Sequence, residues 1–407
     1  MPRTTLALTS FVSGEFSAKM DGRTDFDKYS SGTKTLENFL VHPQGAATRR
    51  VGTQFIAEVK DSSKKTRLIP FEFSTTQTYI MEFGDQYIRF FKDKGQILSG
   101  GSAYEISSPF LEAELFDIKF AQSADVMYLC HPNHDVRKLS RTGHTSWTLA
   151  TVSFSGSPSL PISGSNNRPS CVSFFEQRLV FANTNNNPQT LWFSKAGDYE
   201  NFTTGTNADD AMIYTIASNQ VNAIQYLKAV RTLVVGTSGG EFTVSADGTD
   251  ASITPTNVSI KRQSSFGSAG VDAIPAGNAI LFLQKAKRKI RELAYNFDSD
   301  GYVAPDLTIL NDTVTKSGIV QMIFQQEPDS IIWCVRDDGE LAGLTYQRSE
   351  NVVSWHRHIF GGVFGNGNSV CESAASISGT LTEDELWVIV KRTINGATKR
   401  YVECFSD

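Results

Sequence analysis

The histidines are the residues whose spacing most readily suggests chemistry. His131 and His134 are separated by two residues in a turn that contains Pro132, and this spacing can ligate a metal ion. No third ligand lies near them in the sequence, so we interpret them as turn histidines. His356 and His358 alternate along an expected strand and therefore share one sheet face, where surface packing is favoured over catalysis.

The other patterns that could carry chemistry are incomplete. No serine stands in a nucleophile elbow, and the glycines of 361–367 lack the Lys-Ser/Thr pair and the helix of a phosphate cradle. The turn at 337–339 has neither the Trp of a sialidase-type Asp box nor a twelve-residue calcium loop. The basic stretch 285–291 is best explained as a solvated hairpin tip. We therefore predict no catalytic residue, no cofactor and no metal, and a protein that is not an enzyme.

Composition narrows the class of protein. The 407 residues include 43 acidic and 38 basic side chains, so no strong global field attracts nucleic acid or an anionic membrane. The five cysteines form no CxxC pair and are expected to be reduced structural thiols. The apolar stretch Leu6-Ala7-Leu8 is too short for a signal sequence, and no segment has the length of a membrane span. We expect a soluble protein made in a reducing compartment.

Short apolar runs recur along the chain at a regular interval. Each run is followed by a Gly-, Asn- or Asp-containing turn and a returning strand, which indicates antiparallel hairpins. The centres of the runs are Leu129, Phe181, Val234, Phe282, Trp333 and Trp387. This period of roughly fifty residues is close to the blade length of kelch-type propellers. An irregular pair of β-sandwiches is the alternative, but it requires no fixed period.

The sequence thus predicts an all-β protein built on a β-propeller of about six blades, or seven. Residues 1–52 are expected to form an N-terminal arm with a short helix after Asp25. Residues 53–124 are expected to form either a small β-rich subdomain or a first blade, and the four strand candidates in this region lie within 53–92. Residues 125–407 are assigned to the propeller blades.

Motifs in the arm and beyond resemble those of the tail nozzle, or tail tubular protein B-like, family of short-tailed phages (podoviruses). The resemblance rests on Phe11-Val12-Ser13-Gly14-Glu15, Gly22-Arg23-Thr24-Asp25, Tyr29, Asn38-Phe39, Pro43-Gln44-Gly45, Arg49-Arg50-Val51-Gly52-Thr53, Pro70-Phe71-Glu72-Phe73, Ala121 to Met127, Trp355-His356-Arg357-His358 and Val390-Lys391-Arg392. These motifs span nearly the whole chain, and the arm is the most distinctive part.

The resemblance implies a structural component of the virion tail, synthesised in the host cytoplasm. Such a protein forms a homo-oligomer, expected to be a hexameric ring, below the portal and its adaptor. The ring would retain the genome, conduct double-stranded DNA during ejection, and contact tail fibres or spikes and the host surface. On this basis Arg23, Arg49, Arg50 and Gly52 are expected at a subunit or adaptor contact. For the adjacent arginines, a solvated turn is the simpler alternative.

Two other functions remain open at this point. One is a propeller on the virion that processes or binds glycans, which requires clustered carboxylates at one end of its central channel. The other is a propeller outside phages that serves as an interaction scaffold.

The contact hypothesis leads to a first prediction. Replacing Arg49 and Arg50 together with Ala is expected to block ring assembly, because both guanidinium groups would be lost from the subunit contact. Electron microscopy of the purified variant would test this, and rings of normal appearance would contradict the hypothesis.

Overall fold

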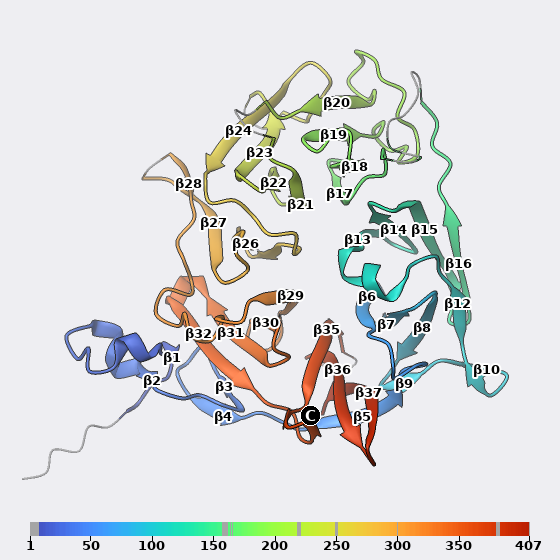
Figure 1. The fold of residues 1–407 in the computed structure, drawn as a ribbon. Helices are drawn as coiled ribbons and strands as arrows, with labels where there is room; N and C mark the ends of the chain where they lie inside the picture. Colours follow the sequence, from blue (N-terminus) through green and yellow to red (C-terminus); the bar gives the residue numbers. More distant parts are fainter. Residues whose placement is uncertain are drawn as a thin grey trace, which may run out of the picture.

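Seven antiparallel sheets stand around a common centre in the computed structural model (Figure 1). The structure describes residues 8–156, 162, 164, 166–217, 221–248, 251–298, 300–379 and 383–406. The propeller prediction is confirmed, and the number of blades is seven. Within the described residues, no helix is long and apolar enough to cross a membrane.

The first four blades follow one another along the chain, and each begins with its innermost strand. Blade 1 contains β6 (Arg67–Ser74), β7 (Gln77–Gly84), β8 (Tyr87–Lys92) and β12 (Glu105–Ser107), with β9 (Gly95–Gln96) added to β8. Blade 2 contains β13 (Lys119–Ser123), β14 (Val126–His131), β15 (His134–Gly143) and β16 (Ser146–Thr151). Blade 3 contains β17 (Cys171–Phe175), β18 (Arg178–Ala182), β19 (Thr190–Phe193) and β20 (Met212–Thr215). Blade 4 contains β21 (Ile224–Ala229), β22 (Leu233–Thr237), β23 (Gly240–Ala246) and β24 (Val258–Ser264).

Blades 5 and 6 are also built from consecutive strands, whereas blade 7 combines strands from the N-terminal and C-terminal parts of the chain. Blade 5 contains β25 (Ile274–Ala276), β26 (Ala279–Leu283), β27 (Ile290–Asn296) and β28 (Gly301–Val303). Blade 6 contains β29 (Ile319–Gln325), β30 (Ile331–Arg336), β31 (Leu341–Gln347) and β32 (Val352–His358). Blade 7 contains β35 (Val370–Ser378), β36 (Asp384–Ile394), β37 (Ala397–Phe405) and, as its outer strand, β5 (Thr53–Glu58). The ring is therefore closed by antiparallel pairing of β5 with β37.

The strand pattern follows from burial on both faces of each blade. In β14, Met127 and Leu129 pack toward blade 1, whereas Tyr128 and Cys130 pack toward blade 3. The described core divides into seven such clusters, one between each pair of neighbouring blades. Because neither face is solvated, the second strand of a blade is apolar throughout, and this explains the recurring runs in the sequence.

The division expected at residues 53 and 125 does not coincide with the blades. Residues 67–107 supply the strands of blade 1, whereas β5 belongs to blade 7. The boundary at 124 separates β13 from β14, although these two strands pair in register. The sequence repeat was centred on the second strand of each blade, so it left the inner strand of blade 2 outside the propeller.

The short helix expected after Asp25 is present as a 3-10 helix at Asp27–Ser31, and the described residues of the arm contain no α-helix. The short elements of the arm are β1 (Gly14–Glu15), η1 (Ala18–Met20), η2 (Asp27–Ser31), β2 (Gly32–Thr33), β3 (Phe39–Val41) and β4 (Ala47–Arg49). The apolar residues that suggested a helical face instead pack separately: Tyr29 stacks on Phe16 at 6.1 Å, and Leu36 is buried. Asn38 adopts a left-handed φ of 61°, which a helix could not accommodate.

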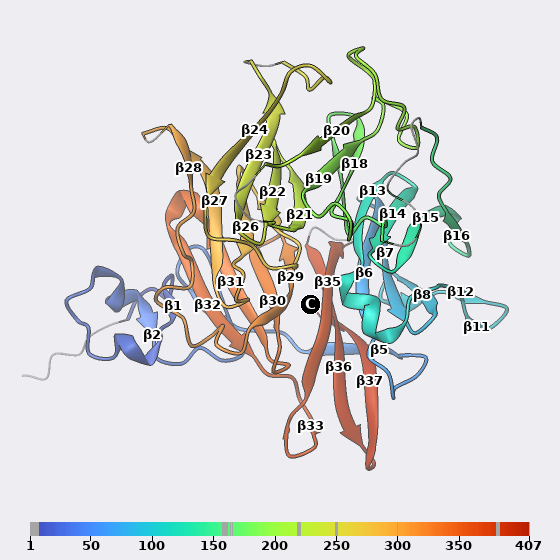
Figure 2. The same cartoon turned by 45° about the horizontal axis from the view of Figure 1, so that its top comes forward.

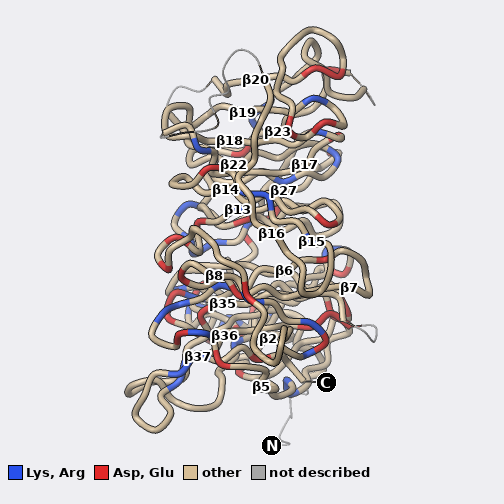
Figure 3. The backbone as a smooth tube through the Cα atoms, turned by 90° about the vertical axis from the view of Figure 1, so that its right-hand side faces the viewer, with Lys and Arg blue, Asp and Glu red and all other residues tan. Residues whose placement is uncertain are grey.

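Two 3-10 helices and two small hairpins remain. A 3-10 helix, η3 (Glu112–Asp117), connects blades 1 and 2, and another, η4 (Arg348–Glu350), lies between β31 and β32. Two small hairpins, β10 (Leu98–Ser99) with β11 (Ser102–Ala103) and β33 (Val363–Phe364) with β34 (Gly367–Asn368), project from the ring. Figure 2 shows β33 and the long strands β36 and β37 extending beyond the disc. Viewed from the side, acidic and basic residues are interspersed over the disc (Figure 3).

The histidine pair of β32 is interior, which corrects the expected surface location. His356 and His358 are both 0% exposed and lie beside Trp333. The two rings share a hydrogen bond, with 2.6 Å between Nδ1 of His356 and Nε2 of His358. Burial lowers the pKa of His356 to about 3, and burial together with His356 and Arg50 lowers the pKa of His358 well below its usual value.

This pair predicts how stability depends on pH. Because both folded pKa values lie below the usual 6.5, the unfolded chain binds protons first as the pH falls. The pair's contribution is complete above pH 6.5 and is lost below it, by about 1.4 kcal/mol per pH unit for each proton taken up. Urea unfolding at pH 7.5, 6.5 and 5.5 measures this slope.

A double variant, His356→Gln with His358→Gln, is the control. It removes both titrations, so its stability should change less over the same pH range. Glu82 is common to both proteins and acts in the opposite sense, because burial raises its pKa to about 7. Equal slopes in the two proteins would contradict the assignment.

Candidate functional site

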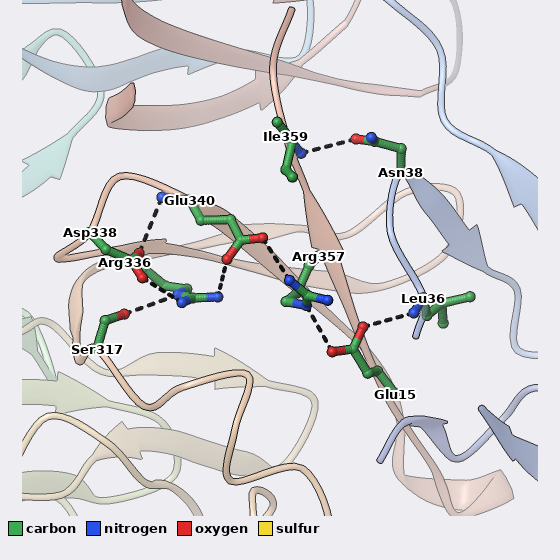
Figure 4. A network of polar contacts seen from close by, with 9 residues as sticks. All are labelled: Glu15, Leu36, Asn38, Ser317, Arg336, Asp338, Glu340, Arg357 and Ile359. Carbon is green, nitrogen blue, oxygen red and sulfur yellow. Dashed lines mark hydrogen bonds and ion pairs between the residues drawn. The ribbon is translucent and has the colours of Figure 1, made fainter. Parts of the chain in front are cut away.

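An alternating chain of charges fastens the N-terminal arm to blade 6 (Figure 4). Glu15 in β1 is buried, and its Oε1 accepts a hydrogen bond from Nε of Arg357 in β32 at 2.7 Å. Its Oε2 accepts from the backbone N–H of Leu36 at 2.7 Å. Arg357 also donates to Glu340 at 3.1 Å, and Glu340 pairs in turn with Arg336. Through its two carboxylate oxygens, Glu15 thus connects β1 both to Leu36 in the arm and to blade 6.

Hydrogen bonding and neighbouring charges outweigh the effect of burial on the pKa of Arg357, whereas burial prevails for Glu340. Burial alone would lower the pKa of Arg357, but the hydrogen bond from Arg357 to Glu15 and the nearby carboxylates raise it above its ordinary value. Burial raises the pKa of Glu340, although Arg336 and Arg357 oppose the shift. A buried ion pair of this kind is costly to break on one side, because the remaining charge has no partner.

Close backbone contacts reinforce the ion pairs. Gly14 has φ of +64°, and a Cβ there would lie 2.3 Å from the backbone nitrogen of Trp355, so only glycine fits. The side-chain oxygen of Asn38 accepts hydrogen bonds from the backbone N–H of Ile359 at 3.0 Å and from Arg50 at 3.2 Å. The arm therefore lies on the edge strand of blade 6 and covers it.

The four residues predicted at a subunit contact do not form one cluster. Arg50 turns inward: it donates to the carbonyl of Ile359 at 2.8 Å and lies over the rings of Phe360 and Phe405 at 5.1 and 5.3 Å. It thereby connects blade 6 to blade 7 within one chain. Arg49, at the end of β4, and Gly52 are exposed. Arg23 is exposed in the turn between η1 and η2, where it pairs with Asp25 at 2.8 Å.

A groove separates this part of the arm from blades 6 and 7. It has a volume of about 460 Å³ and is lined by Leu40, Val51, Trp333, Leu386 and Phe405, among others. At its edge His42 lies 2.9 Å from Asp329. Three large apolar side chains that follow one another along the arm and β5 are exposed: Phe39, Val51 and Phe55. Sequence reasoning did not predict this surface, because its lining comes from opposite ends of the chain.

The fold places Glu114, which lies earlier in the sequence, beside the turn histidines His131 and His134. Donor atoms of Glu114, His131 and His134 lie within 4.8 Å of one another. Glu114 lies 2.7 Å from Nε2 of His134, and Nδ1 of His131 accepts from the backbone N–H of Asn133 at 3.1 Å, whereas the buried Nε2 of His131 has no partner. A neutral ring that accepts at Nδ1 keeps its proton on Nε2, so His131 offers no free lone pair to a metal in this arrangement.

The same group is better suited to holding η3 against the β14–β15 turn. Burial opposes ionisation of Glu114, but hydrogen bonds from Leu111, Asn133 and His134 outweigh it and lower the pKa of Glu114 to about 2. The basic stretch between β26 and β27 likewise has structural contacts, since Lys289 pairs with Asp306 at 2.8 Å and Arg291 lies 3.5 Å over Phe266. Lys285, Lys287 and Arg288 are exposed at its tip.

A second cavity, of about 500 Å³, lies at the centre of the ring and is lined by residues of all seven innermost strands or the loops that lead into them. Its charged side chains are Arg67, Lys119, Lys228 and Asp272. The glycan-processing alternative requires clustered carboxylates at one end of this channel, whereas cations outnumber carboxylates along the described wall.

Comparison with known proteins identifies only the fold of the chain. No model of a protein family matches the chain, and no curated protein matches it in sequence. Among solved structures, the chain is similar to the RRP9 WD40 repeats (TM-score 0.52, 9% identity, covering 87% of this chain and 99% of that chain). It is also similar to U3-55K (TM-score 0.51, 8% identity, 88% and 100%) and to the Cps50 (Swd1) β-propeller domain of Myceliophteria thermophila (TM-score 0.50, 9% identity, 87% and 100%).

The close approach at Gly14 gives a prediction for the arm. Gly14→Ala is expected to detach β1 from β32, because the new methyl group meets the backbone of Trp355. Gly22→Ala is the matched control: Gly22 also has a positive φ, +78°, but nothing lies within 4 Å of an added Cβ. The control should lose only about 1 kcal/mol from backbone strain. Urea unfolding and limited proteolysis of the arm compare the two, and equal effects would contradict the role of the contact.

Proposed function

We propose that this protein is a non-catalytic propeller scaffold that is built into a larger assembly through contacts with other protein chains. The observation that carries the proposal is the groove beside the arm, with the exposed Val51 at its wall and the exposed Phe39 and Phe55 on the same segment. Exposed large apolar side chains on a segment that also lines a groove favour a protein contact surface.

The rigidity of this surface supports the proposal. Arg50 holds the segment between Ile359 and Phe405, and β5 is paired along its length with β37. A surface fixed in this way loses little conformational freedom when a partner binds, so more of the contact energy is available for association. The propeller would thus act as a static support.

A ring component of a short-tailed phage tail is the second candidate. It is favoured by the position of the arm motifs that resemble the tail nozzle family, since Arg23, Arg49 and Gly52 are exposed on the arm. In that function the partners would be further copies of the same chain and the portal adaptor, and the ring would conduct DNA.

Solution mass separates the two candidates. Native mass spectrometry and sedimentation of the purified chain, over a range of concentrations, should give either the 44.8 kDa monomer or six times that mass. A hexamer favours the tail ring, and a monomer favours the scaffold. Release of sugars from a panel of polysaccharides by the purified protein would contradict both, because both are non-catalytic.

Single arginine variants sharpen the contact hypothesis for the ring. Arg49→Ala should abolish oligomers without changing the stability of the monomer, because the Arg49 side chain is exposed. Arg50→Ala should instead lower the free energy of unfolding by about 1–3 kcal/mol, since it removes hydrogen bonds and ring contacts inside one chain. Sedimentation and urea unfolding of each variant provide the readouts. Normal oligomers with Arg49→Ala would exclude Arg49 from the contact.

A further inference from the structure

The central cavity carries an excess of positive charge in a chain whose net charge is −5. Three cationic side chains line it: Arg67 at the start of β6, Lys119 at the start of β13 and Lys228 near the end of β21. They come from blades 1, 2 and 4. The one carboxylate in the described wall is Asp272, in the loop that precedes β25.

Asp272 compensates only part of this charge. Its carboxylate lies 3.0 Å from Nζ of Lys119, and Lys119 also donates to the carbonyl of Gly270 at 2.5 Å. Lys119, Lys228 and Arg67 all act on Asp272 electrostatically and lower its pKa, although burial opposes this effect. The four charged groups therefore form one interacting set, and one negative charge faces three positive ones.

Two of the cations keep unused hydrogen-bonding capacity. Arg67 is 7% exposed and donates through Nη1 to the carbonyls of Leu115 and Ile118, but its buried Nε has no partner. Lys228 is half-buried, and within the described residues no hydrogen bond or ion pair engages its ammonium group. Burial lowers the pKa of Lys228, and the neighbouring Lys119 acts in the same direction. Unpartnered buried donors of this kind are costly unless a ligand or water satisfies them.

We propose that the central channel is a binding site for a small oxyanion, of the phosphate or polycarboxylate class, held by Arg67, Lys119 and Lys228. Oxyanions match these donors, because each oxygen accepts charge-assisted hydrogen bonds from guanidinium and ammonium groups. The volume of about 500 Å³ is ample for such a ligand. The bound anion would connect blades 1, 2 and 4, which are not all neighbours in the ring.

The channel shares part of its wall with a neighbouring cavity. The neighbouring cavity has a volume of about 450 Å³. It has Phe116, Gly270 and Val271 in common with the wall of the channel and extends to the exposed Lys287. Lys65 lines this neighbouring cavity, with its Nζ 4.2 Å over the ring of Phe116. These lysines would draw an anion toward the channel, while Glu112 and Asp117 in the same wall moderate the field.

Thermal unfolding and calorimetric titration with inorganic phosphate and with citrate test the proposal, against sodium chloride at matched ionic strength. We expect at least one of the two oxyanions to raise Tm and to bind measurably, while chloride does neither. Phosphate alone would assign the site to phosphate-like ligands, and citrate alone would assign it to polycarboxylates. If neither oxyanion exceeds chloride, the proposal is wrong.

Three variants locate the binding. Lys228→Gln should weaken oxyanion binding about tenfold, because it removes one charged donor. Lys261→Gln is the matched control, since Lys261 is exposed on β24, the outer strand of the same blade, and this variant should bind as the wild type does. Asp272→Asn should strengthen binding, because it removes the competing carboxylate. Equal affinity of the wild type and Lys228→Gln would overturn the assignment to the channel. None of these readouts depends on oligomeric state, so the result is separate from that of the proposed function.

Discussion

Closure of the ring is the constraint on which the rest of the structure depends. Each blade buries both faces against its neighbours, and the seven interblade clusters together form a circular core. A circular core leaves no outer face for a terminal blade, so the last blade must meet the first. The cluster between them joins Leu68, Ile80 and Phe91 of blade 1 to Trp387 and Val402 of blade 7. Blade 7 has its outer strand only because β5 pairs with β37.

Much of this fold could be predicted from the sequence, because burial on both faces produces a simple signal. The six run centres, from Leu129 to Trp387, all lie in the second strands of blades 2 to 7. Blade 1 was harder to recognise, since the four strand candidates of 53–92 belong to two blades. Adjacency in the sequence suggested that they form one sheet, whereas ring closure assigns β5 to the other end of the chain.

The candidate surfaces were predicted less well, because their partners lie far apart in the sequence. The adjacent Arg49 and Arg50 are conspicuous in the sequence, but the partner of Arg50 at Ile359 is 309 residues away, and only the fold reveals that Arg50 turns inward. Glu114 was likewise not connected with the turn histidines. The sequence does contain a pattern related to the channel. Arg67, Lys119 and Cys171 each begin an innermost strand, and they follow one another at intervals of 52 residues. A search for charged residues at the repeat period would have found the first two.

The pairing of β5 with β37 also has a consequence for biosynthesis. Strand β5 ends at Glu58, and β37 begins at Ala397, so a nascent chain exposes β5 long before its partner has been translated. At typical elongation rates this interval is on the order of tens of seconds. During that time blades 1 to 6 can stack upon one another, but the ring remains open. The closed ring, and every surface that includes both β5 and β37, can form only after β37 has been translated.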